Sequence, residues 1–340
     1  MTTLKEISAE LGLSVTTVSR ALNGFPEVKK ATREKVQRAA DRLGYRPNRV
    51  AQRLVTGRSG MVGMIVKIKP DMSADQTFFE ILTGLTAALA EQETDLVLAV
   101  DQDGDPVEPY QKLLERDILD GFILNAPQLN DPRVNYLQER GIPFILHGQD
   151  RLAPDYPTYG IDNAAVSEDS VKLLVQLGHR RIALINGEMN AAYAFDREAG
   201  FKGAMQDQGL SPEMVRNGAS LESHGYVNAL DLLSQANPPT AFVCATTLVA
   251  AGVINAARDR GLQVPQDVSV IAHDDALPLT RAINFEPALT VTRAPLRDSC
   301  VPLAQMLVAH LNGTPAKDLQ QILKADLIVR GSTGPAPKED

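Results

Sequence analysis

The 340-residue chain contains no tryptophan, only two cysteines and no apolar run long enough to cross a membrane. A transmembrane helix needs roughly 18 or more consecutive apolar residues, so we expect no membrane contact. The N-terminal segment MTTLKEISAE lacks the apolar core of a secretory signal, which predicts a cytoplasmic protein. Cys244 and Cys300 show no metal-ligand spacing and lie in apolar surroundings, so we expect buried, reduced thiols and no metal site.

Catalytic motifs are also lacking. No glycine-rich dinucleotide motif follows the first strand candidate, which runs instead into Lys69-Pro70-Asp71, and no serine elbow is present. His273-Asp274-Asp275 could suggest acid–base chemistry, but no further motif supports it. We therefore predict that the protein is not an enzyme and needs no cofactor.

Charge is distributed unevenly along the chain. Residues 1–60 hold 12 Lys and Arg against 5 Asp and Glu, whereas residues 61–340 hold 22 against 37. A net charge of +7 at the N-terminus attracts phosphate, while a net charge of −15 on the remainder discourages nonspecific docking. The asymmetry predicts an N-terminal segment that binds nucleic acid.

Residues 3–23 have the pattern of two short amphipathic helices joined at Gly12, with Ser14 placed to cap the second. Apolar residues that face inward are Leu4, Ile7, Leu11, Val18 and Leu22. The second helix leaves outward Val15, Thr16, Thr17, Ser19 and Arg20. Small polar groups with one arginine can approach base edges in the major groove. The alternative is an ordinary helical hairpin with a solvated face.

A third helix is predicted over residues 31–43, ended by Gly44. The following stretch, 48–55, begins at Asn48, a good N-cap, and pairs Val50 with Leu54. A helix this short is below the ~12–15 residues needed for stability alone in water. The stretch is therefore either a plain linker or an element that folds against a partner copy and DNA.

From Met61 onward, apolar strand candidates alternate with amphipathic helices. The strand candidates are residues 61–68, 96–100, 121–124, 143–147, 181–185, 241–245, 268–272 and 327–329. Helix candidates between them include residues 80–91, 163–177 and 196–208. Buried strands crossed by helices form parallel sheets. The pattern predicts an α/β core of two doubly wound parallel-sheet subdomains.

Polar side chains follow several of these strands, where ligands bind in such folds. They are Asn125, His147, Asn186 and Asp274. Arg197 lies near the start of a helix, with Tyr193 one turn earlier on the same face. A guanidinium that faces a carboxylate can hydrogen-bond to two vicinal hydroxyl groups, one group donating and the other accepting. This arrangement suits a sugar. The structural alternatives are an ion pair for Arg197, a helix cap for Asp274 and a core position for Phe78.

The segments LKEISAELGLSVTTVSRALNG and ATREKVQRAADRLGYRPNRVAQRLVTGRSGMVGMIV closely resemble the lactose repressor/galactose repressor family of bacterial transcription regulators. Later segments agree: FFEILTGL, LGHRRIALING, DREAGFKGAM and DVSVIAHDD. The resemblance implies a helix-turn-helix head (1–47), a hinge helix and linker (48–60), and a core like periplasmic sugar-binding proteins (61–340). Within that core it implies an N-subdomain (about 61–160 and 292–322) and a C-subdomain (about 161–291 and 323–332). It also implies a homodimer.

The resemblance assigns base reading to Val15, Thr16 and Arg20, and phosphate contacts to Thr17, Ser19 and Asn23. We expect Arg20 to contact a guanine, with a purely phosphate contact as the alternative. Leu54 resembles the family's wedge residue in the minor groove, or else packs on the core. Asn48 and Arg49 beside it are further expected DNA contacts. The expected partner is therefore a pseudo-palindromic operator in duplex DNA.

For the effector, the resemblance implies contacts from Phe78, His147, Tyr193, Arg197, Thr246 and Asp274. Two departures from the family pattern leave the particular sugar undefined. Thr246-Thr247 replaces a frequent Asn-Asp, and Ser220 stands where many relatives have an aromatic residue. We expect an oligosaccharide such as an α-glucoside, with a sugar phosphate or a nucleobase as alternatives.

The resulting prediction is a cytoplasmic, nucleoid-associated repressor whose operator affinity a sugar-like effector switches. A corepressor-type regulator is the alternative, and a stand-alone sugar-binding protein is disfavoured by the basic head. The tail lacks a leucine heptad, which favours a dimer over a tetramer.

Overall fold

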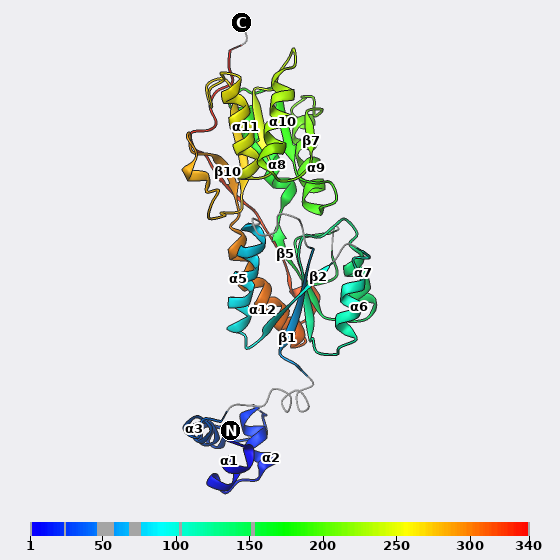
Figure 1. The fold of residues 1–340 in the computed structure, drawn as a ribbon, viewed down its shortest axis with the longest axis vertical. Helices are drawn as coiled ribbons and strands as arrows, with labels where there is room; N and C mark the ends of the chain where they lie inside the picture. Colours follow the sequence, from blue (N-terminus) through cyan, green and yellow to red (C-terminus); the bar gives the residue numbers. More distant parts are fainter. Residues whose placement is uncertain are drawn as a thin grey trace. The chain divides into compact units, whose positions relative to one another are not determined.

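The computed structural model describes residues 2–23, 25–45, 58–67, 76–101, 104–150 and 154–338 (Figure 1). Contacts divide the chain into two units, Met1–Met61 with Ile118–Asp120 and Val62–Asp117 with Gly121–Asp340. In the ranges just given, no helix is long and apolar enough to cross a membrane. Residues 48–57 of the predicted hinge and linker, among them Asn48, Arg49 and Leu54, lie outside the described residues.

Three helices form the head, residues 2–45: α1 (Leu4–Leu11), α2 (Val15–Leu22) and α3 (Lys30–Arg42). Thr3 and Glu6 form a reciprocal capping box at the start of α1. Gly12 ends α1 at φ 65°, a left-handed conformation that costs glycine no steric strain. Ser14 then caps α2 by accepting the N–H of Thr17 at 3.0 Å. These caps fix where the turn between the helices begins and ends.

The head has its own small core, which the three helices enclose. Its buried side chains are Ile7, Val18, Ala21, Val28, Val36, Ala39 and Ala40. Val18 faces inward as predicted, and Leu22 is half-buried and packs against this core, which also includes the neighbouring Ala21. An ion pair of Glu10 with Arg42 ties α1 to α3. The core orients α2 so that its remaining residues face outward.

The second unit contains two six-stranded sheets. The first, in spatial order, consists of β11 (Gln320–Leu323), β5 (Thr158–Ile161), β4 (Phe144–His147), β3 (Gly121–Leu124), β1 (Met61–Lys67) and β2 (Asp95–Asp101). The second consists of β12 (Asp326–Ile328), β10 (Thr290–Arg293), β9 (Ser269–Asp274), β8 (Ala241–Cys244), β6 (Ile182–Asn186) and β7 (Val215–Asn217).

Helices cover both faces of each sheet (Figure 1). On the first sheet they are α5 (Gln76–Ala90) with α12 (Cys300–Leu311), and α6 (Glu108–Leu114) with α7 (Pro132–Glu139). On the second they are α8 (Asn163–Gln176) with α9 (Ala192–Asp207), and α10 (Glu222–Leu233) with α11 (Thr247–Asp259). Short 3₁₀ turns occur at Ala282–Asn284, Leu296–Ser299 and Ala316–Asp318. The first sheet with its helices is the first subdomain, and the second sheet with its helices is the second.

The chain passes between the subdomains three times: after β5, after β10 and after β11. The predicted α/β class with two doubly wound sheets is confirmed. One correction concerns the edge strand β12, which pairs antiparallel to β10, with Thr292 opposite Leu327. The structure also adds β5, β7, β10 and β11, which the apolar pattern did not predict. The residues of β11 are all exposed, and β7 has only three residues, so neither leaves an apolar run.

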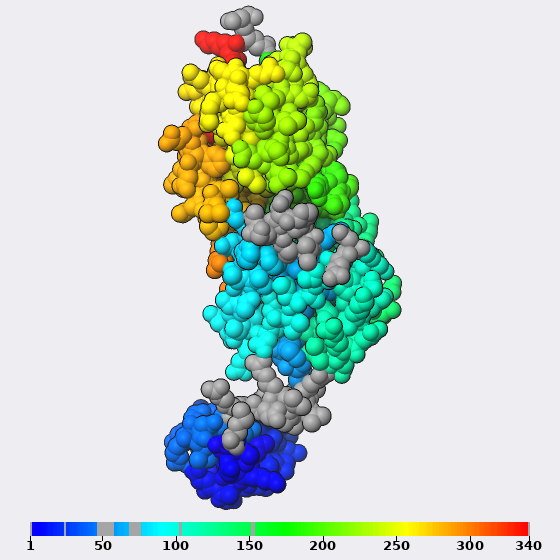
Figure 2. All heavy atoms as spheres, in the orientation of Figure 1, coloured from blue at the N-terminus to red at the C-terminus, as the bar shows by residue number. Residues whose placement is uncertain are grey.

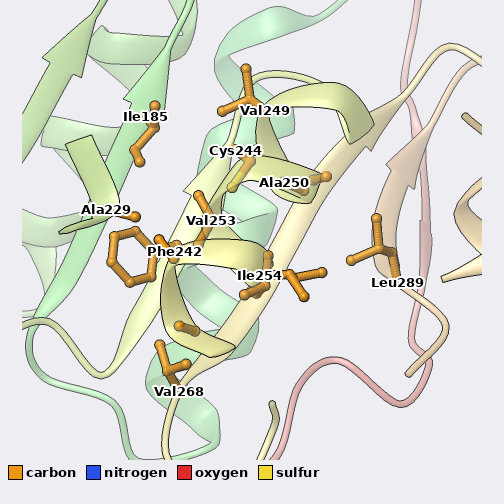
Figure 3. Close-up of a cluster of buried hydrophobic side chains, with 14 of the residues drawn as sticks. Ile185, Ala229, Phe242, Cys244, Val249, Ala250, Val253, Ile254, Val268 and Leu289 are labelled. Atoms are coloured by element: carbon orange, nitrogen blue, oxygen red, sulfur yellow. The ribbon is translucent and has the colours of Figure 1, made fainter. Parts of the chain in front are cut away.

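The core of the second subdomain lies between its sheet and the helices α10 and α11 (Figure 3). Phe242 of β8 and Val253 of α11 are fully buried there. Cys244 lies in the same cluster and Cys300 is buried under α5, both as free thiols, which agrees with the expectation of buried, reduced cysteines. Burial raises the pKa of Cys244, so the thiol stays protonated at neutral pH. These packed cores hold the carboxyl ends of the strands in place.

Candidate DNA-binding head and effector site

The outer face of α2 presents the residues predicted to read DNA. Val15, Thr16 and Arg20 are exposed, while Val18, on the opposite side, is completely buried. Thr17 and Ser19 are half-buried at the edges of this face. The hydroxyl of Thr17 lies 2.8 Å from that of Ser14, so both groups are turned toward the start of the helix. This arrangement leaves one arginine and short side chains on an accessible helical surface.

Asn23 ends α2 and folds its amide back onto the helix. Its Nδ2 donates to the carbonyl of Ser19 at 2.9 Å. The amide nitrogen is thereby committed to the helix end, and the Asn23 backbone N–H also bonds there, to Ser19. The predicted phosphate contact of Asn23 therefore competes with a capping bond.

Arg197 is the centre of the candidate effector site. It lies on α9 and is only 6% exposed. Its Nε donates to Oδ1 of Asn163 at 2.9 Å, and its Nη1 donates to the carbonyl of Ala245 at 2.8 Å. Asn163 begins α8 directly after the crossover from β5, and Ala245 follows β8. Two segments distant in sequence thus fix one guanidinium at the carboxyl ends of the strands.

Tyr193 covers this guanidinium from one turn earlier in α9. The Cζ of Arg197 lies 4.9 Å from the centre of the Tyr193 ring, within the range of a cation–π contact. The ring is half-buried, and its hydroxyl lies 3.5 Å from Oγ of Ser220, the limit of a hydrogen bond. The pairing of Tyr193 with Arg197 that the spacing predicted is present.

The two aspartates at the end of β9, Asp274 and Asp275, differ in their surroundings. Oδ1 of Asp274 accepts the N–H of Ala276 at 2.8 Å, and Oδ2 lies 3.6 Å from Nε of Arg293. One oxygen of Asp274 therefore bonds to the turn at Ala276, and no helix begins there for Asp274 to cap. Asp275 carries the charge that acts on Arg197, although no direct ion pair joins the two among the described residues.

Electrostatics within this group follow from burial and proximity. Burial would by itself raise the pKa of Asp275, but nearby His273, 3.4 Å away, and the charge of Arg197 lower it below its usual value. Burial lowers the pKa of Arg197, and the Asp275 charge opposes that effect. A guanidinium cannot be deprotonated in proteins, so the site holds one buried cation near one carboxylate.

His147 ends β4, as predicted, and belongs to the same electrostatic group. Its Nδ1 lies 3.0 Å from Oδ1 of Asn125, the residue that follows β3. Burial lowers the pKa of His147 to about 4, with the Asp275 charge opposing the shift. The ring is therefore neutral at physiological pH and can donate through Nδ1 to Asn125.

The remaining predicted residues lie at element ends. Thr246 is the N-cap of α11, and its hydroxyl accepts the N–H of Val249 at 3.2 Å. Phe78, near the start of α5, is half-buried and meets Phe79 edge-on at 5.4 Å. The first residue of α5, Gln76, reaches the loop after β9 by accepting the N–H of Leu279 at 2.9 Å. Phe78 thus lies two residues from a contact between the two subdomains.

Asn163 was not predicted at the site, and Asp275 was named beside Asp274 but not assigned a ligand contact. The signal for Asn163 was its position just after a strand, but β5 itself was missed. Asp275 was passed over because its neighbour Asp274 matched the family position. Only the three-dimensional turn at Ala276, with a φ of 58°, separates the roles of the two carboxylates.

Comparisons with known proteins cover the whole chain. The family of bacterial regulatory proteins, lacI family, matches residues 3–48, and the periplasmic binding protein-like domain matches residues 171–333. The HTH-type transcriptional regulator AglR of Rhizobium meliloti (strain 1021) is 39% identical over 337 residues, 98% of this chain and 95% of that protein. The HTH-type transcriptional regulator RafR of Escherichia coli is 31% identical, over 98% of this chain and 99% of that protein.

The solved structures that are similar to this chain are also transcriptional regulators. The transcriptional regulator CelR–cellobiose complex matches with a TM-score of 0.71 and 29% identity, over 98% of this chain and 100% of that one. The lac repressor dimer bound to operator and the anti-inducer ONPF matches with a TM-score of 0.77 and 25% identity, over 98% and 99%. These relatives are transcriptional regulators and not enzymes. The chain belongs to the LacI family of helix-turn-helix transcriptional regulators.

Proposed function

We propose that this regulator is a repressor whose operator affinity is switched by a neutral sugar bound at Arg197. The observation that carries the proposal is the buried Arg197 guanidinium with Asp275 and Tyr193 beside it. It lies in a chain that also presents an exposed arginine on α2. A cation buried near a carboxylate without a direct ion pair can be satisfied by hydroxyl groups that accept from one and donate to the other.

The charges favour a neutral ligand over a phosphate. The charge of Asp275 acts on Arg197, and Asp274 lies 3.6 Å from Arg293, so each of these guanidinium groups already has a carboxylate near it. A dianionic phosphate would meet both carboxylates as well as the cations. A sugar offers hydroxyls to both kinds of group and a C–H face to an aromatic ring. The relative CelR was solved with cellobiose, which supports the sugar class for this chain. The proposed contacts are those of Phe78, His147, Tyr193, Arg197, Thr246, Asp274 and, in addition, Asp275.

For DNA, we propose that residues 1–47 bind an operator half-site, with 48–60 as hinge and 61–340 as the sensing core. Arg20 reads a base edge with Val15 and Thr16, and Thr17, Ser19 and Asn23 contact phosphates. Asn48, Arg49 and Leu54 complete the interface. The exposed face of α2 supports this assignment, because a base-reading helix must leave its polar side accessible.

The proposed unit is a cytoplasmic homodimer on a pseudo-palindromic operator. One surface that supports self-association belongs to α5 and the edge strand β2. Phe79 is 47% exposed, and Leu98 and Val100 are each 41% exposed. Figure 2 shows α5, in cyan, at the visible surface of the first subdomain. An exposed apolar edge strand is otherwise a liability that proteins cover.

The test is a thermal-shift screen of the full chain, followed by DNA binding. The compounds are sucrose, trehalose, maltose, cellobiose, glucose 6-phosphate and guanine. We expect a neutral disaccharide to raise the melting temperature by mass action and to weaken binding to DNA from the gene's own upstream region. Stabilisation by glucose 6-phosphate or guanine with tighter DNA binding would instead establish the corepressor alternative. Sugar binding without any DNA binding would overturn the regulator proposal.

A further inference from the structure

The turn that follows β6 packs against Tyr193 through a residue without a side chain. An added Cβ at Gly187 would lie 2.7 Å from Cζ and 2.9 Å from Cε2 of Tyr193, and closer still to its hydroxyl oxygen. Real side chains do not approach so closely. The ring of Tyr193 therefore occupies space that only glycine at position 187 leaves open.

The same turn also bonds to the segment that meets the hydroxyl of Tyr193. The carbonyl of Gly187 accepts the N–H of Gly218 at 3.3 Å, and Ser220, two residues on, meets the Tyr193 hydroxyl. On α9 the ring rests over the guanidinium of Arg197. Tyr193 is thus bordered by the turn after β6, the turn after β7 and the buried cation, all at the carboxyl ends of strands.

We propose that Gly187 is a specificity-determining position of the effector site, because it sets where the Tyr193 ring lies. The inference rests on the proposed sugar-binding function. The chain has no tryptophan, and position 220 carries a serine, so Tyr193 is the aromatic face beside Arg197. Its half-buried ring can take the C–H face of a pyranose while Arg197 binds the hydroxyls. A methyl group at position 187 would push the ring off the guanidinium.

The test compares Gly187→Ala with Gly203→Ala in the full chain. Gly203 lies on the same helix as Tyr193, and an added Cβ there meets nothing within 4 Å. Because a tyrosine side chain can rotate aside, we expect Gly187→Ala to displace the ring without unfolding the protein. A crystal structure of ligand-free Gly187→Ala measures this directly. A Tyr193 ring that keeps its place over Arg197 would overturn the inference.

The second measurement is calorimetric binding of sucrose, trehalose, maltose and cellobiose. We expect Gly187→Ala to lower the affinity for the preferred disaccharide roughly tenfold, since the loss of a stacking and cation–π arrangement is of that order. The ratio of this affinity to the affinities for the other sugars should also become smaller. Gly203→Ala should match the wild type. A displaced ring with unchanged ratios would overturn the specificity role alone. If the wild type binds none of the four sugars, the proposed effector class fails, and the role of Gly187 fails with it.

Discussion

Arg20 and Arg197 carry the same guanidinium in opposite surroundings. Arg20 is exposed on α2, whereas Arg197 is 6% exposed and held by Asn163 and Ala245. An exposed, unconstrained arginine can adapt to a base edge or a phosphate, while a buried one is preorganised for a single ligand geometry. The environment of each residue, and not its type, therefore separates the two proposed roles.

The first prediction concerns Arg20. If Arg20 makes a bidentate contact to guanine, Arg20→Ala should cost about 1–3 kcal/mol at the cognate base pair and relax selectivity there. Selection from a randomised duplex library, performed on wild type and variant, measures the preference position by position. Lys5→Ala, on α1, is the matched control for loss of one positive charge. Uniform weakening over all sequences would show that Arg20 only contacts phosphate.

The second prediction concerns His147 and pH. Burial lowers its pKa from the ordinary 6.5 to about 4 in the folded state, so between these values the unfolded chain binds more protons. The free energy of unfolding should therefore fall as the pH drops from 6.5 to 4, by up to about 3 kcal/mol from this residue. Burial lowers the pKa of His179 and His273 too, so the slope has several contributors.

The variant His147→Gln should flatten this dependence without abolishing it. Urea unfolding at pH 7, 6, 5 and 4 provides the comparison. Parallel curves for the wild type and the variant would mean that His147 is not buried as a neutral ring.

At the scale of elements, the second subdomain depends on the close approach of α8 and α9. Gly200 of α9 faces the backbone of Ala164, and an added Cβ would lie 2.8 Å from both Cα and the carbonyl carbon. Backbone atoms cannot rotate aside as a tyrosine side chain can. The two helices carry Asn163 and Arg197, so their spacing also sets the hydrogen bond between these residues.

The third prediction follows from this packing. Gly200→Ala should separate the helices and destabilise the protein by about 1–3 kcal/mol, the usual cost of overpacking. Gly203→Ala, on the same helix but facing open space, should stabilise it by about 0.5–1 kcal/mol, because alanine loses less conformational entropy. The midpoints of urea unfolding distinguish the two. Equal midpoints would contradict the packing argument.

At the scale of the whole molecule, the C-terminal segment is tied into the second subdomain. Ser332 exchanges backbone and side-chain bonds with Val270, and His179 lies 3.1 Å from the carbonyl of Gly334. The third passage between subdomains therefore ends in a fixed anchor. Three connections and contacts such as that of Gln76 with Leu279 provide the means by which a ligand at Arg197 could change the relation of the subdomains.

The fourth prediction is reciprocity between the sugar and DNA. If a disaccharide weakens operator binding by a given factor, saturating operator must weaken disaccharide binding by the same factor, about 5–150-fold for typical coupling. Titrations of the sugar with and without operator, and of the operator with and without sugar, give both factors. In the Arg197→Leu variant, which should not bind the disaccharide, only binding to the operator should remain measurable. Unequal factors in the wild type would exclude a single coupled equilibrium.

Most of the head was predictable because its signals are local. A capping residue, a glycine at the corner and apolar side chains every three or four positions depend only on neighbours in sequence. The helices α1 and α2 lie within residues 3–23 on either side of Gly12, and α3 matches the expected range 31–43 within a residue. The strands of the body were predictable where the chain carries a run of apolar side chains, whereas the buried strands β5 (TYGI) and β10 (TVTR) mix in polar residues and were missed. The exposed edge strand β11 and the short β7 carry no such pattern.

The sequence by itself determined the charge asymmetry, the helix-turn-helix, the alternation of strands and helices, and the presence of an arginine and carboxylates at strand ends. Only the tertiary structure decided that Asp274 accepts a bond from the turn at Ala276 while the charge of Asp275 acts on Arg197, that Asn163 holds the guanidinium, and that Gly187 makes room for Tyr193. The physical reason is the separation along the chain over which each interaction acts. Periodicity and capping act within a few residues, whereas these contacts join segments that meet only when the sheet has brought their ends together.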